Sequence, residues 1–351
     1  MTISRRGVLL GAMGLPTSLA LAATARPASA AQPAAGTDDH TTDDPATAYV
    51  DVSVATLWVS PGTDRPVDLP STTNPADPAG WMAAMSLADR VWLVGELETQ
   101  ASYGQAVRIL ARSGDWVNVA VVGQPTPRNP LGYPGWMPAA QLTTGRGFAP
   151  LTGRPFATVI GDTAKLYHTP HRIEPFLELS FNTRLPVLSR TPDGVHVATP
   201  ADGPKWLRRE DVAVYDTVAD IPRPTGGDLV ATANRFVGVR YLWAGVSTYG
   251  FDCSGFTSTV YSAHGITIPR DAGPQHDAGV PVAREDLRAG DLIFFAHNNG
   301  MGSIHHVGMC AGDGDIIDAP TNTATVEGGV ERVKLAEHRY IKEYAGAVRY
   351  L

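Results

Sequence analysis

Phe251-Asp252-Cys253-Ser254-Gly255-Phe256 is the stretch that decides the fold of the last third of this 351-residue chain. Residues 253–264 follow with helical spacing, so Cys253 stands at a predicted helix start. There the helix macrodipole and unpaired backbone N–H groups favour a thiolate, the form of cysteine that attacks carbonyl carbons. The alternative is a small buried residue at a strand-to-helix joint. The surrounding sequence decides between a catalytic thiol and a buried structural residue.

The segment around Cys253 reads as helices followed by a sheet. Helical spacing covers 228–237 and 253–264, and apolar strand-like runs cover 292–295, 306–310, 315–319 and 345–350. Asp313-Gly314 separates two of these strands and is a strong hairpin signal. The pattern predicts an α+β domain over residues 226–351.

Two all-β units are predicted upstream, at 49–145 and 146–220. Short apolar runs alternate there with turn residues, which is typical of small β-barrels. Both units end in a similar way, one at Gly135-Trp136-Met137-Pro138 and the other at Lys205-Trp206-Leu207. We therefore expect two divergent copies of one barrel type. The insert at 81–92 has helical spacing and predicts one short helix within the first unit.

The N-terminus predicts export. Ser4-Arg5-Arg6 is followed by an apolar stretch and by the small-residue site Ala28-Ser29-Ala30. Residues 1–30 are therefore interpreted as a twin-arginine-type signal peptide, and 31–48 as a disordered linker. The apolar stretch is short and interrupted by Gly and Pro, which argues against a stable membrane insertion after signal removal. The mature protein is expected to be secreted or associated with the cell wall.

Charge and cysteine content narrow the function further. The formal net charge is −7, which argues against nucleic-acid binding. The chain has 2 cysteines, Cys253 and Cys310, fewer than a disulfide-stabilised secreted protein would carry. A thiol that stays free in an exported protein favours a catalytic role, although a Cys253–Cys310 disulfide remains an alternative.

Five motifs follow one another in the last third of the chain: Tyr241-Leu242-Trp243-Ala244-Gly245, the Cys253 hexapeptide, Ile268-Pro269-Arg270, Gly290-Asp291-Leu292-Ile293-Phe294-Phe295 and His306-Val307-Gly308. In this order they resemble the NlpC-type bacterial cell-wall cysteine peptidases, which have a papain-like core. The first upstream unit contains Gln100-Ala101-Ser102-Tyr103-Gly104, Gly114-Asp115-Trp116 and Gly132-Tyr133-Pro134-Gly135-Trp136. On these motifs the upstream units resemble the bacterial SH3-like domains of the subgroup similar to the γ-D-glutamyl-L-diamino acid endopeptidase YkfC. The fold class implied is two SH3-like barrels followed by an α+β papain-like peptidase domain.

Three residues are expected to act with Cys253. His306 opens an apolar strand and is the candidate base that holds the thiol proton. His305 must point to the opposite strand face, so it is the weaker candidate. By resemblance a third residue, commonly histidine, orients the base, and Asp318 stands at that position; a solvent-facing hairpin aspartate is the alternative. Tyr241 is expected near the developing oxyanion, beside the backbone N–H of Cys253.

Substrate residues come from the resemblance as well. The subgroup cuts stem peptides of the type L-Ala-γ-D-Glu-diamino acid after the D-Glu and requires a free N-terminal L-Ala. Glu98, Asp252 and Ser254 match the positions that bind the α-ammonium group, and Tyr133 would close the pocket. Glu98 as a surface charge and Tyr133 as a packing residue are the alternatives. Arg270 faces either the D-Glu carboxylate or Asp271.

The predicted function is thus an exported γ-D-glutamyl-L-diamino acid endopeptidase that hydrolyses peptidoglycan stem peptides and needs no cofactor. The alternative is a catalytically silent protein that binds the wall through its SH3-like domains. His297, His305 and His306 do not have the spacing of a common metal site. Cys310 lies on the same strand face as His306, so its oxidation is a further hypothesis for silencing the site.

Overall fold

The structure, a computed structural model, describes residues 45–351. The predicted signal peptide and most of the predicted linker lie outside these residues. The last four linker positions, 45–48, are described, and at the last two the structure differs from the prediction. Thr47 and Ala48 belong to strand β1, where they pair with Arg108 and Val107. Within the described residues, no helix is long and apolar enough to cross a membrane.

The first sheet has seven antiparallel strands in the order β3-β2-β6-β5-β4-β1-β7. Alternate side chains of its strands, such as Val50, Leu57 and Val119, point into one apolar core. The strands are β1 (Thr47–Val50), β2 (Val54–Trp58), β3 (Leu97–Ser102), β4 (Ala106–Ser113), β5 (Trp116–Val121), β6 (Tyr133–Pro138) and β7 (Leu142–Thr143).

The insert of the first sheet forms three helices, α1 (Leu69–Thr72), α2 (Pro78–Ala84) and α3 (Leu87–Trp92). The prediction of one helix over 81–92 was wrong, because the chain is extended at Met85 and Ser86. Ser86 caps α3 by accepting from the backbone N–H of Asp89, whose carboxylate accepts from the N–H of Ser86. This capping box starts a new helix.

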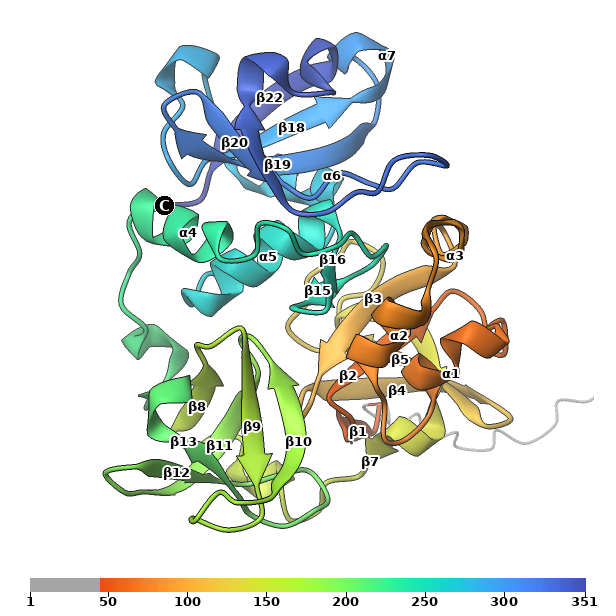
Figure 1. Cartoon of the computed structure of the whole chain (residues 1–351), viewed down its shortest axis with the longest axis vertical. Helices are drawn as coiled ribbons and strands as arrows, with labels where there is room; N and C mark the ends of the chain where they lie inside the picture. The colour runs from red at the N-terminus through yellow and green to blue at the C-terminus, as the bar shows by residue number, and fades with distance from the viewer. Residues whose placement is uncertain (1–44) are drawn as a thin grey trace, which may run out of the picture. The chain divides into compact units, whose positions relative to one another are not determined.

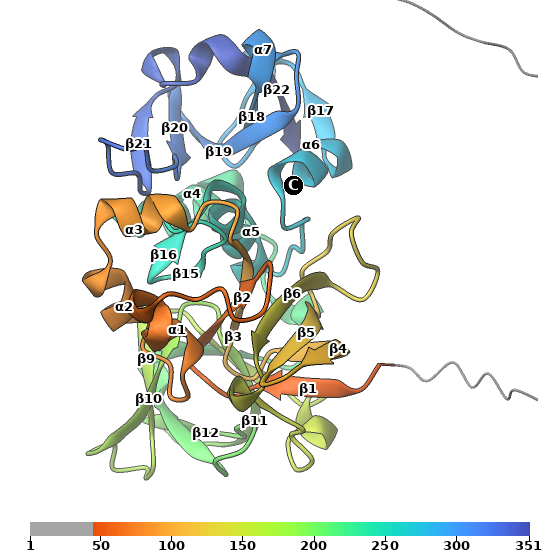
Figure 2. The ribbon, with the colours of Figure 1, turned by 90° about the vertical axis from the view of Figure 1, so that its right-hand side faces the viewer.

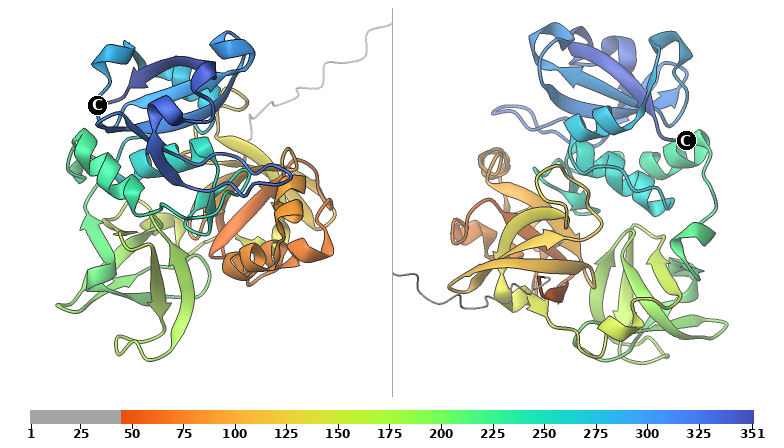
Figure 3. Two further views of the ribbon diagram at one scale, coloured as in Figure 1. Left: turned by 45° about the horizontal axis from the view of Figure 1, so that its top comes forward. Right: turned by 180° about the vertical axis from the view of Figure 1, so that it is seen from behind.

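The second sheet repeats the topology of the first. Its order is β10-β9-β13-β12-β11-β8-β14, which is the order of the first sheet with each strand number raised by seven. Figure 3 shows the two as separate sheets, one orange to yellow and one green. The shared order supports the predicted repeat, and closure of each sheet into a barrel stays a prediction. The strands are β8 (Phe156–Val159), β9 (Thr163–Tyr167), β10 (Pro175–Ser180), β11 (Arg184–Arg190), β12 (Gly194–Val197), β13 (Lys205–Arg208) and β14 (Val212–Tyr215).

The last segment is α+β, as predicted. Its helices are α4 (Gly226–Asn234), α5 (Cys253–Ala263), α6 (Ala272–Ala278) and α7 (His297–Gly300). A six-stranded antiparallel sheet has the order β17-β22-β18-β19-β20-β21, with strands β17 (Val280–Val282), β18 (Leu292–Ala296), β19 (Ile304–Gly312), β20 (Asp315–Asp318), β21 (Glu331–Lys334) and β22 (Tyr344–Arg349). The strands β15 (Val246–Ser247) and β16 (Gly250–Phe251) form a separate pair before α5. Turns of 3₁₀ helix lie at Pro66–Asp68, Ala139–Gln141, Ala149–Leu151, Arg209–Asp211, Val218–Asp220, Arg284–Asp286, Leu335–Glu337 and Ile341–Glu343.

One apolar core holds α4 and α5 against this sheet. It includes Leu229 of α4, Val260 of α5 and Met309 of β19, all with no exposed surface. In Figures 1 and 2 both helices lie beneath the blue strands β18, β19 and β20. The β19–β20 hairpin turns at Asp313-Gly314, both with positive φ, which confirms the predicted turn. This packing brings the first residue of α5 to the strand that carries His306.

Candidate active site

Cys253 is the first residue of α5. Asp252 precedes it in extended conformation and caps the helix, with Oδ1 accepting from the backbone N–H of Gly255 at 2.6 Å. Gly255 has no room for a side chain, because a Cβ there would lie 2.0 Å from the carbonyl oxygen of Gly245. The hexapeptide thus builds a tight helix start with the cysteine at its first turn.

The thiol of Cys253 is held in its neutral form. Burial, and after it the charge of Asp252, raises its pKa to about 12. Hydrogen bonds from the backbone N–H groups of Val307 and Ser254, and the charge of Arg270, act in the opposite direction but do not offset burial. The helix start was expected to lower this pKa, and desolvation explains the difference. The contact with Val307 also places the sulfur beside the neighbour of His306.

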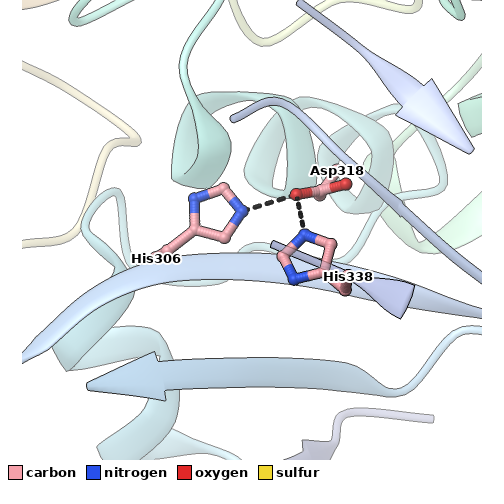
Figure 4. A group of neighbouring side chains, drawn as sticks. All are labelled: His306, Asp318 and His338. Atoms are coloured by element: carbon pink, nitrogen blue, oxygen red, sulfur yellow. Dashed lines mark hydrogen bonds and ion pairs between the residues drawn. The ribbon is translucent and has the colours of Figure 1, made fainter. Parts of the chain in front are cut away.

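His306 is fixed by the β19–β20 pairing. It is 3% exposed, and its Nε2 lies 2.6 Å from Oδ2 of Asp318. Asp318 stands opposite Gly308 in the β-ladder, and a Cβ on Gly308 would lie 2.8 Å from the Cβ of Asp318. Figure 4 shows Nδ1 of His306 turned away from the carboxylate. Nε2 of His306 is thus engaged by Asp318, and Nδ1 is left to accept a proton from another group.

A bulge in β19 interrupts the predicted alternation at His305, because Phe295 pairs with His306 and Ala296 pairs with Ile304. The rings of His305 and His306 lie 6.5 Å apart, and both stand edge-on to Tyr340, so the predicted placement on the opposite face was wrong. Nε2 of His305 lies 2.9 Å from Oε2 of Glu343, and its ring stacks on His297 with 4.5 Å between centroids. Burial lowers the pKa of His305, and the hydrogen bond to Glu343 acts against it. His305 is therefore held by Glu343 and His297 at the edge of the His306 site.

Asp318 has no exposed surface and carries two imidazole partners. Besides His306, Nε2 of His338 lies 2.9 Å from the same oxygen, Oδ2, as Figure 4 shows. Burial alone would raise the pKa of Asp318, but the hydrogen bonds from the two histidines, followed by the positive charge that each ring carries when protonated, outweigh it and leave the pKa below its ordinary value. The alternative of a solvent-facing hairpin aspartate is therefore wrong.

His338 and Tyr340 were missed by the sequence analysis. His338 lies 20 residues after Asp318, in a stretch without a recognisable motif. The ring of Tyr340 stands edge-on to His306, with 5.0 Å between centroids. Both residues follow the 3₁₀ turn Leu335–Glu337, and only the fold brings them to the catalytic strand. A histidine in a loop carries no local signal that would have identified it.

His306, Asp318 and His338 also form a set in which one ligand atom of each lies within 4.8 Å of the others, as in a metal site. The hydrogen bonds of His338 argue against metal binding by this set. Nδ1 of His338 accepts from the backbone N–H of Tyr340 at 3.3 Å, so a neutral ring carries its proton on Nε2. That nitrogen then donates to Asp318 and offers no lone pair to a metal.

Tyr241 is 2% exposed and packs in the core that also contacts Cys253. Burial, followed by the nearby charges of Cys253 and Asp252, raises the pKa of Tyr241 well above its ordinary value. Its hydroxyl therefore stays protonated and remains a donor near the nucleophile, as the predicted oxyanion role requires.

Each of the four expected substrate residues contacts an arginine, either Arg128 or Arg270. Both carboxylate oxygens of Glu98 accept from Arg128, one of them at 2.8 Å from Nη2. Arg128 also lies over the ring of Tyr133, whose hydroxyl donates to Asp271 at 3.0 Å. The sequence analysis did not foresee Arg128.

Arg270 contacts the other two expected substrate residues, Asp252 and Ser254. It is 2% exposed and binds both oxygens of Asp252, at 3.1 and 2.7 Å. It also donates to Ser254 Oγ at 3.0 Å and to Thr99 Oγ1 at 3.1 Å. The sequence-based alternatives for Arg270 were the D-Glu carboxylate and Asp271, and neither of them named Asp252. Asp252 therefore caps α5 and neutralises a buried arginine.

Cys253 and Cys310 are both free thiols, so the structure does not contain the bridge left open by the sequence. Cys310 is 5% exposed and packs among Ile293, Ile316 and Leu335. Burial raises the pKa of its thiol. Its oxidation as a control of the site stays a prediction.

Comparison with known proteins gives consistent matches. Residues 238–349 match the NlpC/P60 family, and residues 159–215 match the YKFC SH3b2 domain. The gamma-D-glutamyl-L-lysine dipeptidyl-peptidase of Bacillus cereus (strain ATCC 10987 / NRS 248) is 51% identical over 306 residues, 87% of this chain and 91% of that protein. The protein of the same name from Bacillus subtilis (strain 168) is 35% identical over 302 residues, 85% of this chain and 96% of that protein.

A solved structure agrees with these matches. The crystal structure of an NlpC/P60 family protein from Bacillus cereus ATCC 10987 superimposes with a TM-score of 0.83 and 50% sequence identity. The superposition covers 87% of this chain and 99% of that one. The similarity therefore extends over the upstream sheets as well as the segment that carries Cys253.

Proposed function

The chain belongs to the NlpC/P60 family and is a cysteine peptidase related to peptidoglycan hydrolases, and we propose that it cleaves the bond after γ-D-Glu in stem peptides with a free N-terminal L-Ala. The observation that carries this proposal is the approach of Cys253, at the start of α5, to the strand on which His306 bonds Asp318. Two relatives of high coverage bear a name that specifies γ-D-glutamyl-L-lysine and dipeptide release.

The catalytic step starts from a neutral thiol. Because burial raises the pKa of Cys253, its proton passes to His306 as the sulfur attacks the γ-carbonyl carbon. The imidazolium formed is stabilised by the ionised Asp318. The backbone N–H of Cys253 and the hydroxyl of Tyr241 are the proposed donors to the oxyanion.

The intermediate is a thioester between Cys253 and the γ-carboxyl of D-Glu. The amine of the diamino acid leaves with the proton that His306 had accepted. A water molecule then attacks the thioester while His306 takes a proton from it, and the thiol departs with that proton. The products are L-Ala-γ-D-Glu and the peptide that begins with the diamino acid.

The charge of the expected substrate residues and their partners supports selection of a free amine. Glu98, Asp252 and Asp271 bring three carboxylates, whereas Arg128 and Arg270 bring two guanidinium groups. The difference, 3 − 2 = 1, leaves one negative charge for one α-ammonium group, which needs such a partner in a closed pocket. An acylated N-terminus brings no positive charge and would leave that carboxylate unpaired.

The proposal includes action outside the cytoplasm. It is supported by the twin-arginine run Ser4-Arg5-Arg6 and the cleavage site Ala28-Ser29-Ala30, which lie outside the described residues. Secretion is tested by expressing the full chain in a bacterial host with a twin-arginine pathway. We expect the mature protein outside the cytoplasm, and retention after Arg5→Lys with Arg6→Lys. An equal distribution of both forms would contradict export.

The specificity is tested with matched peptides. L-Ala-γ-D-Glu-L-Lys and its diaminopimelate counterpart are offered with a free or an acetylated N-terminus, and kcat/KM is measured for each. We expect the free peptides to be preferred by about 100-fold, since a buried carboxylate loses its partner in the acetylated complex. Equal cleavage of both forms would contradict the free-amine requirement. Absence of cleavage of all four would contradict the proposed substrate class.

A further inference from the structure

The carboxylate of Asp318 depends on a residue outside the predicted catalytic set. Its Oδ2 accepts from His306 at 2.6 Å and from His338 at 2.9 Å. Within residues 45–351, Oδ1 has no hydrogen-bond partner although it is buried. A buried carboxylate needs hydrogen bonds to stay charged. His338 therefore supplies one of the two hydrogen bonds that the carboxylate of Asp318 accepts within the described residues.

The ring of His338 is held in one orientation and one tautomer. It has no exposed side-chain surface and stacks on Phe295, with centroids 4.6 Å apart and planes at 25°. The backbone N–H of Tyr340 donates to Nδ1, which leaves the ring proton on Nε2, facing Asp318. The ring also lies nearly parallel to that of His306, at 17°. Figure 4 shows both rings converging on one carboxylate oxygen.

We propose that His338 is a positioning residue of this peptidase, a neutral imidazole that keeps Asp318 ionised and aimed at Nε2 of His306. The inference rests on the proposed roles of Cys253, His306 and Asp318. The role of His338 also explains how Asp318 can orient His306 at a position where the family commonly has a histidine. A buried carboxylate is a stronger acceptor than a neutral ring, but it needs a second donor, and His338 provides it.

The charges around Asp318 balance during the reaction only if His338 stays neutral. When His306 accepts the thiol proton, its positive charge and the negative charge of Asp318 cancel. Two other titratable groups lie next to this pair: Tyr340, whose pKa is raised by burial so that its hydroxyl stays protonated, and His305, whose pKa is lowered by burial. A second cation at His338 would oppose formation of the imidazolium on His306.

The kinetic test compares His338→Gln and His338→Phe in the full chain. Glutamine can place an amide N–H where Nε2 stood, whereas phenylalanine keeps the ring and removes the donor. We expect His338→Phe to lower kcat by about 100-fold with little change in KM, since misplacement of a remote group can cost that much. We expect the acid limb of its kcat profile to move to higher pH, because Asp318 then protonates more readily. His338→Gln should retain most of the activity.

A matched control removes another histidine ring from its packing partner. His196 stacks on Trp206 in the second sheet, with 4.5 Å between centroids, and His196→Phe should leave kcat and the pH profile unchanged. An equal loss in His338→Phe and His338→Gln would show a packing role and overturn the proposal. So would an unchanged pH profile in a folded His338→Phe.

A substrate-free measurement separates this proposal from the proposed function. In ¹⁵N–¹H spectra of histidine-labelled protein, with His338 assigned through His338→Gln, we expect a protonated Nε2 and an unprotonated Nδ1 in the resting enzyme. A proton on Nδ1, or on both nitrogens, would contradict the proposal whatever peptide the enzyme cleaves. Failure of the wild type to cleave any stem peptide would instead contradict the proposed function.

Discussion

Oδ2 of Asp318 lies 2.6 Å from Nε2 of His306, across the ladder between β20 and β19. Neutralising this carboxylate should therefore disable the base while leaving its shape in place. We expect Asp318→Asn to lower kcat by about 10²- to 10⁴-fold with little effect on KM, as loss of the orienting anion does in Ser-His-Asp enzymes. Steady-state kinetics and a melting curve measure both effects. A kcat within twofold of wild type, in a folded variant, would remove Asp318 from the mechanism.

The raised pKa of Cys253 predicts a pH dependence for alkylation of the free enzyme. Since the pKa is about 12, the thiol is neutral at pH 7 and ionises only as the pH rises toward that value. The rate of iodoacetamide modification at Cys253, followed by peptide mapping, should therefore keep rising above pH 9. A plateau that begins below pH 6 would instead show a thiolate–imidazolium pair in the resting enzyme. Cys253→Ala supplies the background from Cys310.

Gly255 should tolerate no side chain. A Cβ at this position would lie 2.0 Å from the backbone carbonyl of Gly245, which cannot move independently. Gly255→Ala should lower the free energy of unfolding by about 2 kcal/mol or more, as overpacking does, and reduce activity. The control is Gly273→Ala in α6, where a Cβ meets no atom within 4 Å. Denaturant unfolding of both variants measures the difference, and equal stabilities would contradict the account of the helix start.

Arg128 should limit the affinity for free-amine substrates, because it occupies both carboxylate oxygens of Glu98. Arg128→Gln removes one positive charge beside Glu98, so KM for L-Ala-γ-D-Glu-L-Lys should fall several-fold while kcat changes little. Glu98→Gln should raise KM for the same peptide. A higher KM in Arg128→Gln would instead assign this arginine to a carboxylate of the substrate.

The sequence predicts those parts of the site that lie in regular elements. Cys253 at a helix start and His306 on a strand follow from local motifs, and the spacing of Asp318 fits the hairpin that Asp313-Gly314 turns. The break between α2 and α3 was also readable, since Ser86 and Asp89 form a capping box. The apolar spacing of 81–92, taken alone, favours one continuous helix.

The partners of these residues could not be predicted in the same way. Arg270 reaches Asp252 across 18 residues, Arg128 reaches Glu98 across 30, and His338 reaches Asp318 across 20. Each contact joins segments with no common period or motif, so only the packing of the sheets and helices brings them together. The raised pKa of Cys253 likewise results from burial, which only the packed fold creates. The helix start alone predicts a lowered pKa.

The central claim, that Cys253 cleaves the γ-D-glutamyl bond, is tested most directly by the products released from L-Ala-γ-D-Glu-L-Lys. Wild type and Cys253→Ala are incubated with this peptide, and the products are identified by chromatography and mass spectrometry. We predict that wild type releases L-Ala-γ-D-Glu and free lysine, and that folded Cys253→Ala releases neither. Cleavage between L-Ala and D-Glu, or dipeptide release by Cys253→Ala, would contradict the account.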